Sequence, residues 1–191
     1  RRHGSARLHE LTGKVPDPTP ALYKLHWLNE HEPGLVARAH RVVDVHGYLV
    51  GRLTGQWCTS WASADPLGLV DMKSLDYSDE VLAGVGVQRA QLPTLVAPGE
   101  TVGVLTPQVA ESVGLRGDIP LIAGAGDGQC AGLGADVTAS GSAYLNLGTA
   151  VVSGMHSSQY LWDRAFRTLA SPLRGAYTLG AYGRAIDKKL S

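Results

Sequence analysis

The sequence predicts an α/β fold, because segments with helically spaced apolar residues alternate with short apolar runs that end at glycines. The most informative stretch is 119–134, where a short apolar run stops at glycines and passes through Asp127 into small residues that can open a helix. A second β-rich stretch, 142–147, is followed by a Gly-Thr pair. The first pattern places an acidic residue just beyond the C-terminal end of a strand, where α/β proteins collect their ligands.

Helices are expected through the first half of the chain, each bounded by a residue that suits a helix end. Gly13 and Gly55 suit helix C-termini, because glycine adopts the left-handed conformation that closes a helix. Ser78 suits an N-cap before two acidic residues, and Pro33 suits a first helical turn. The expected helices, in chain order, are 8–13, 22–30, a helix restarted at Pro33, 43–53, and a short helix after Ser78.

Strands and turns are expected in the second half, where prolines and glycines interrupt short apolar runs. Thr106 and Pro107 suit the start of a helix that Gly114 ends. The expected elements, in chain order, are loops and short strands over 92–105, the helix 106–114, a strand over 120–123, a helix to Ala135, a strand over 142–147, and a returning hairpin arm over 151–155.

The composition indicates a globular protein, with 44% hydrophobic and 18% charged residues. The 17 basic and 17 acidic side chains cancel, so we expect no nucleic acid as a partner. We also expect no membrane association, because no apolar run reaches the roughly 18 residues of a membrane span. Cys58 and Cys130 are too few for a disulfide framework and favour a cytoplasmic protein with reduced thiols. The histidines lack the spacing of a zinc-binding helix, so we expect no metal site and assign them surface or packing roles.

Asp127 also allows two other interpretations. Residues 126–131 fit the dinucleotide fingerprint G-x-G-x-x-G/A, but that fingerprint needs an acidic residue about 20 positions later. Asp136 comes too early and Asp163 too late, and an Asp inside the turn would oppose a pyrophosphate. The simpler alternative is a turn residue or helix cap, the commonest role of an Asp among glycines.

A second glycine turn favours phosphoryl transfer instead. Gly148 and Thr149 lie between two expected strands and offer backbone N–H groups and a hydroxyl to a phosphate, although a plain hairpin turn would look the same. The carboxylate of Asp127 can accept a hydroxyl proton as a phosphoryl group arrives. Together the two features suggest phosphoryl transfer to a hydroxyl group.

Ordered motifs extend the argument along most of the chain. They are K-L-H-W-L-N-E-H-E-P (24–33), Y-L-V-G-R-L-T-G (48–55), L-T-P-Q-V-A (105–110), A-G-A-G-D (123–127) and L-G-T (147–149). In this order they resemble the FGGY carbohydrate kinases, the family of xylulokinase, ribulokinase and glycerol kinase, from Leu8 to Gly180. Xylulokinase-like members are the most similar, because of the Trp61 segment and residues 171–177.

This resemblance implies two actin-like (ribonuclease-H-like) α/β domains with the active site in the cleft between them. Residues 1–137 would be the latter part of an N-terminal sugar-binding domain, 138–181 the start of a C-terminal nucleotide-binding domain, and 182–191 an unassigned tail. The implied activity is ATP-dependent phosphorylation of a sugar or polyol hydroxyl, with a ketopentose such as xylulose as the first choice. ATP and Mg²⁺ would be the cofactors, a sugar the small-molecule partner, and a homodimer is compatible with the resemblance.

The resemblance also assigns the site residues. Asp127 would be the catalytic base and, with Gly128, would contact the sugar, whereas Gly148 and Thr149 would contact the nucleotide phosphates. Gly128 stands where the family commonly has Asn or Gln, so the substrate is expected to differ.

Two further departures lie in the Trp61 segment, where Ser60 replaces the usual Asp and Asp65 the usual Ser. The family's opening D-x-G-T phosphate loop and its later glycine-rich adenine-binding segment have no counterpart among these 191 residues. The chain alone is therefore expected to be inactive. The alternative is a non-catalytic fragment or a pseudokinase sugar-binding module.

Overall fold

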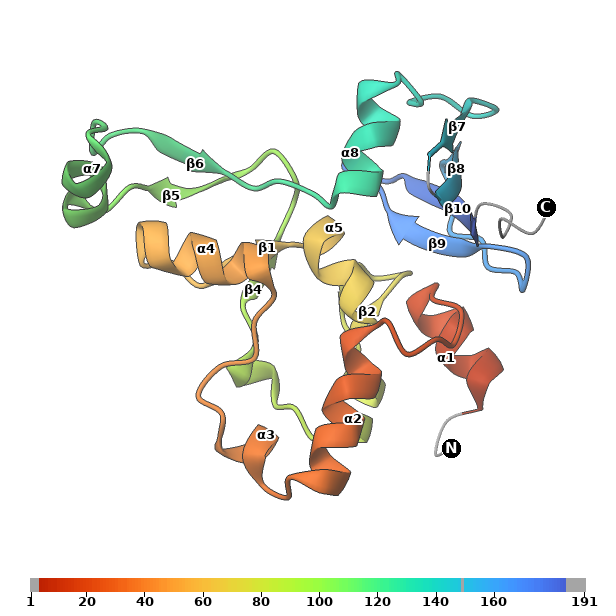
Figure 1. Cartoon of the computed structure of the whole chain (residues 1–191), viewed down its shortest axis with the longest axis horizontal. Coiled ribbons are helices and arrows are strands. Elements are labelled where there is room, and N and C mark those ends of the chain that lie inside the picture. The colour runs from red at the N-terminus through yellow and green to blue at the C-terminus, as the bar shows by residue number, and fades with distance from the viewer. Residues whose placement is uncertain (1–3, 149, 185–191) are drawn as a thin grey trace, which may run out of the picture.

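The computed structural model describes residues 4–148 and 150–184 (Figure 1). Its α-helices are α1 (Ser5–Thr12), α2 (Ala21–His31), α3 (Leu35–Arg38), α4 (Val45–Thr54), α5 (Trp61–Ala64), α6 (Asp79–Val85), α7 (Pro107–Val113) and α8 (Asp127–Gly134), with short 3-10 helices η1 (Asp65–Leu67) and η2 (Arg89–Gln91). Its strands are β1 (Cys58–Ser60), β2 (Val70–Asp71), β3 (Asp76–Tyr77), β4 (Thr94–Val96), β5 (Thr101–Val104), β6 (Pro120–Ile122), β7 (Ala143–Leu147), β8 (Ala150–Ser157), β9 (Arg167–Ala170) and β10 (Tyr177–Arg184).

Apart from Pro33, the residues predicted to bound the helices do so in the structure. Gly13, Gly55 and Gly114 all close helices with positive φ angles, of 70°, 77° and 66°. The hydroxyls of Ser78 and Thr106 each accept a hydrogen bond from a backbone N–H in the first turn of the following helix. Ends of α1, α4, α6 and α7 were therefore predictable from local sequence signals.

A helix restarts after Pro33 as predicted, but Pro33 is not in its first turn. Pro33 lies in a turn, and α3 begins only at Leu35. The residue before it, Gly34, has a φ of 81°, which would not continue a helix. Gly34, in this left-handed conformation, is therefore the N-cap of α3, and Pro33 lies outside the helix.

Four sheets are present in the described part of the chain. The largest has the strand order β7-β8-β10-β9 and is antiparallel throughout, and its β7–β8 pair is the predicted hairpin, with Leu147 opposite Val151. The two-stranded sheets are β1–β4, which is parallel, and β2–β3 and β5–β6, which are antiparallel. Strands β1, β2, β3, β9 and β10 and helix α5 were not predicted.

Helix α8 lies between two differently built parts of the molecule (Figure 1). On one side, α7 and the β5–β6 ribbon project away, and on the other the β7–β10 sheet begins. Among the described residues β6 pairs only with β5, so Asp127 follows an antiparallel ribbon rather than a strand of a parallel sheet. The carboxylate nevertheless comes after the C-terminal end of a strand, as predicted.

The largest core lies beneath α1, α2 and α6, where burial of aliphatic side chains supplies the main stabilisation. Its buried members are Leu11, Leu22, Leu25, Val36, Ala64, Leu69, Val70, Tyr77, Val81, Leu82, Val85, Val87 and Leu92. A smaller core, comprising Val50, Cys58, Val102 and Ala123, joins α4 to the start of the segment that carries Asp127. Between residues 4 and 184, no described helix is long and apolar enough to cross a membrane. Part of the 182–191 tail, residues 185–191, lies outside the described residues.

Candidate active site

Asp127 is the first residue of α8 and is exposed. One of its carboxylate oxygens, Oδ1, accepts a hydrogen bond from the backbone N–H of Gly128 at 2.7 Å. The N-cap residue is Gly126, which has no side chain to satisfy the free N–H groups of the first turn. A carboxylate in this position is stabilised by the positive end of the helix and still faces solvent, where a ligand can reach it.

Helix α8 is anchored to the first part of the chain by Gln129. Its side chain is buried, and its Nε2 atom donates to the backbone carbonyl of Ala62 in α5 at 2.8 Å. The amide also explains the glycine at 126, because a Cβ atom there would lie 2.4 Å from Oε1 of Gln129. Gln129 therefore ties the first turn of α8, which carries Asp127, to α5.

Tyr144 connects α8 to the second part of the chain. Its hydroxyl donates to the backbone carbonyl of Gly128 at 3.2 Å. Two glycines make room for the ring, since a Cβ atom at Gly154 would lie 2.4 Å from Tyr144 Cε1 and one at Gly132 would lie 3.1 Å from it. The contact brings β7 against the first turn of α8.

The predicted phosphate turn starts at the far end of the same strand. Gly148 follows β7 and is exposed, whereas Thr149 lies outside the described residues. Gly148 is four positions after Tyr144, which corresponds to about 13 Å along a strand. Tyr144 therefore contacts α8, whereas Gly148 lies beyond the end of β7.

The loop before Asp127 is held by a histidine that the sequence analysis assigned only to the surface or to packing. The backbone N–H of Gly124 donates to Nε2 of His46 at 3.1 Å, and Nδ1 of the same ring lies 3.1 Å from Oγ1 of Thr59. The Thr59 hydroxyl donates to Oδ2 of Asp44 at 2.9 Å. The half-buried His46 therefore belongs to a polar chain that ends three residues before Asp127.

The hydrogen-bonded chain around His46 predicts that the stability of the protein depends on pH. Burial lowers the pKa of His46 from its ordinary 6.5, and Asp44 only partly opposes the shift. Between the lowered pKa and 6.5, the unfolded chain binds a proton that the folded chain does not, so stability falls as the pH falls through this window. We expect His46→Gln to lose less stability than the wild type as the pH falls. Urea unfolding midpoints between pH 8 and pH 5 measure the difference.

The variant is needed because burial lowers the pKa of His9 as well, and both histidines contribute to the profile of the wild type. The difference between the two profiles isolates His46. Parallel profiles for the wild type and His46→Gln would contradict the prediction.

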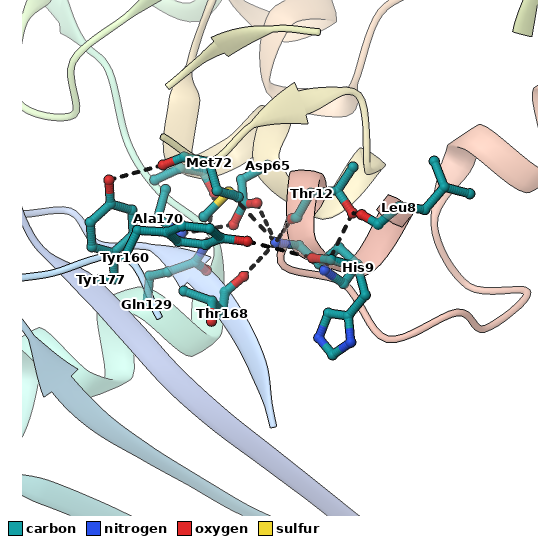
Figure 2. A network of polar contacts seen from close by, with 12 residues as sticks. Leu8, His9, Thr12, Asp65, Met72, Gln129, Tyr160, Thr168, Ala170 and Tyr177 are labelled. Carbon is teal, nitrogen blue, oxygen red and sulfur yellow. Dashed lines mark hydrogen bonds and ion pairs between the residues drawn. The ribbon is translucent and has the colours of Figure 1, made fainter. Parts of the chain in front are cut away.

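A second polar network, around Lys14 and Asp65, lies where α1, η1 and β9 meet (Figure 2). Lys14 forms a buried ion pair with Oδ1 of Asp65, and its Nζ also donates to the carbonyls of Thr168 at 2.6 Å and Thr12 at 3.0 Å. The other oxygen, Oδ2 of Asp65, accepts from the backbone N–H of Ala170 at 2.9 Å. Burial lowers the pKa of Lys14 and raises that of Asp65, while the opposite charge of each partner counteracts both shifts.

The two residues that depart from the family pattern in the Trp61 segment both make specific contacts. Ser60 is the N-cap of α5 and accepts from the backbone N–H of Ser63 at 3.0 Å. Asp65 follows α5 directly and carries the ion pair. The segment 61–67 therefore contacts Lys14 through Asp65 and Gln129 of α8 through the carbonyl of Ala62.

The residues that hold Asp127 were not predicted from the sequence. Gln129, Tyr144 and His46 make their contacts with residues 67, 16 and 78 positions away, respectively. Local spacing carries no signal for such pairings. Asp44, the N-cap of α4, fell inside the helix predicted over 43–53 and was not predicted as a cap.

Comparison with known proteins places this arrangement in context. The family model described as the FGGY family of carbohydrate kinases, N-terminal domain, matches residues 1–134. The L-fuculokinase of Escherichia coli (strain K12) is 35% identical over 129 residues, covering 68% of this chain and 27% of the relative. The xylulose kinase of Streptomyces rubiginosus is 36% identical over 140 residues, covering 73% of this chain and 28% of the relative.

A solved structure extends the likeness through the β7–β10 sheet. The xylulose kinase of Rhodospirillum rubrum superposes with a TM-score of 0.88 over 95% of this chain and 37% of that one, at 22% identity. This likeness confirms the predicted actin-like (ribonuclease-H-like) α/β fold. The chain spans between 27% and 37% of the length of these three proteins.

Proposed function

We propose that this chain, which belongs to the FGGY family of carbohydrate kinases, serves the ATP-dependent phosphorylation of a sugar or polyol hydroxyl. The observation that carries the proposal is the presentation of Asp127, an exposed carboxylate on a helix N-terminus that three neighbouring contacts hold in place. In the proposed division, residues 1–137 belong to a sugar-binding domain and 138–181 begin a nucleotide-binding domain.

The proposed role of Asp127 is that of general base. A carboxylate oxygen takes the proton of the acceptor hydroxyl while the hydroxyl oxygen bonds to the γ-phosphorus of ATP and the bond to ADP breaks. Gly128 would leave space for the sugar beside this carboxylate, because a Cβ atom added there would meet nothing within 4 Å. The products are a sugar phosphate, ADP and one proton held by Asp127.

Gly148 is proposed to approach the phosphates of ATP, together with Thr149. Gly148 is exposed at the end of a strand and has no side chain to keep a phosphate at a distance, so the residue fits this task. Mg²⁺ would arrive with ATP, because the ion commonly binds through substrate phosphates and few carboxylates. In the described part of the chain, no three His, Cys, Asp or Glu side chains gather into a site for the ion.

A ketopentose such as xylulose is the proposed substrate. The proteins compared above are named as an L-fuculokinase and xylulose kinases, which supports a sugar as the substrate. A cytoplasmic location and a homodimer remain predictions from the sequence.

A coupled assay of ADP release tests the proposal. The full-length gene product that contains this chain is supplied with MgATP and a panel of ketopentoses, deoxyketoses, aldonates and polyols. We expect ADP release that depends on one class of sugar, with xylulose among the accepted compounds. A folded protein that releases no ADP with any member of the panel would contradict the kinase activity.

A further inference from the structure

The hydrogen bonds around His46 have a fixed direction. The backbone N–H of Gly124 can only donate, so Nε2 of His46 accepts and carries no proton. In the neutral ring the proton is then on Nδ1, which donates to Oγ1 of Thr59. The Thr59 hydroxyl donates in turn to Oδ2 of Asp44, so every member of the chain has a matching donor and acceptor.

The end of this hydrogen-bonded chain at Asp44 is held at the N-terminus of α4. Oδ1 of Asp44 caps α4 by accepting from the backbone N–H of Gly47 at 3.0 Å. Gly47 is packed so closely that a Cβ atom there would lie 2.7 Å from Oδ1 of Asp44 and 3.0 Å from Pro93. The imidazole is therefore attached to a capped helix and to strand β1 rather than to a mobile loop.

The end of this hydrogen-bonded chain at Gly124 lies in a glycine-rich loop. Gly124 and Gly126 flank Ala125 between β6 and α8, and glycine restricts the backbone least. The hydrogen bond to His46 is made by the first of these glycines, three positions before Asp127. Without it, the loop could change its path and move the start of α8.

We propose that His46 is a positioning residue, whose imidazole clamps the Gly124 peptide and so fixes where the carboxylate of Asp127 meets the acceptor hydroxyl. This inference rests on the proposed function. Both ring nitrogens of His46 are engaged by the protein, so the residue acts through Asp127 and not on the substrate. Chemistry of this kind is sensitive to placement, because a displacement of about 1 Å can cost about 10²-fold in rate.

The kinetic test compares two replacements of His46 in the full-length gene product. His46→Leu removes the acceptor, and we expect kcat to fall by up to about 10²-fold, with the KM values for sugar and ATP nearly unchanged. His46→Gln places a side-chain carbonyl within reach of the Gly124 N–H and should restore most of the loss. The exposed His40→Leu is the matched control and should match the wild type.

Thr59→Val supplies a second variant if His46→Leu folds poorly. It removes the hydroxyl between His46 and Asp44 at almost constant volume, and we expect a smaller fall in kcat with the same unchanged KM. A change in the KM values alone would overturn the inference. So would a wild-type kcat in both His46→Leu and Thr59→Val.

A structural measurement on the 191-residue chain separates this inference from the proposed kinase activity. Long-range ¹H–¹⁵N NMR at pH 8 should show His46 protonated at Nδ1 and bare at Nε2, and hydrogen exchange at the Gly124 amide should speed up in His46→Leu. A ring protonated at Nε2, or an unchanged exchange rate, would overturn the clamp even in an active kinase. The expected NMR result in a protein that phosphorylates no sugar would instead overturn the proposed function and leave the clamp without its catalytic role.

Discussion

Asp127→Asn should lower the turnover of the full-length gene product by about 10²–10⁴-fold, the usual contribution of a positioned general base. Asparagine keeps the shape of the side chain and can still accept from the backbone N–H of Gly128, so the first turn of α8 should persist. What it loses is the capacity to take the hydroxyl proton. We therefore expect kcat to fall while the KM for the sugar changes far less, measured by initial rates over sugar concentration.

The same preparation needs a thermal melt and a matched control. Asp118→Asn changes another exposed aspartate, ion-paired with Arg116 outside the site, and should leave both rate and melting unchanged. If Asp127 is only a helix-end residue, Asp127→Asn should reduce stability and leave the rate per folded molecule intact. A stable and fully active Asp127→Asn variant would refute the mechanism.

Lys14→Met should reduce the free energy of unfolding by about 3–5 kcal/mol, because it leaves the buried carboxylate of Asp65 without its cation. Total stabilities of about 5–15 kcal/mol make this loss a large share of the whole. Lys14 also ties β9 to the end of α1 through the carbonyls of Thr168 and Thr12, so these contacts are lost together. Urea unfolding followed by circular dichroism measures the change.

The double variant Lys14→Met with Asp65→Asn tests whether the unpaired charge is the cause. No buried charge then remains, and the Asn carbonyl can still accept from the backbone N–H of Ala170. We expect this variant to recover much of the lost stability. A double variant less stable than Lys14→Met alone would show that packing, rather than the unpaired charge, accounts for the loss.

The sequence predicted the elements whose ends carry local signals. Thr106 with Pro107 and the hairpin after Leu147 belong to this group, since capping and alternation operate within a few residues. Asp127 was found in the same way, as an acidic residue among glycines after a strand. The short strands β1 and β2 had no such pattern, because two or three residues are too few to show a period.

The support of the site depends on contacts that no local pattern encodes. His46 was assigned to the surface or to packing, but in the structure its ring accepts from the Gly124 N–H. Asp65 was a departure from the family motif, and in the structure it pairs with Lys14. Both side chains are polar groups whose burial is compensated by partners from distant segments. Such pairings become visible only when the fold has brought the segments together.

Phosphorus NMR of a single reaction mixture tests the central claim most directly. The full-length gene product is incubated with MgATP and an accepted sugar, and the fate of the γ-phosphate is followed. A sugar phosphate ester that grows in step with ADP, and only when the sugar is present, is the predicted result. Inorganic phosphate that grows in step with ADP at the same rate without sugar would contradict it, because the acceptor would then be water.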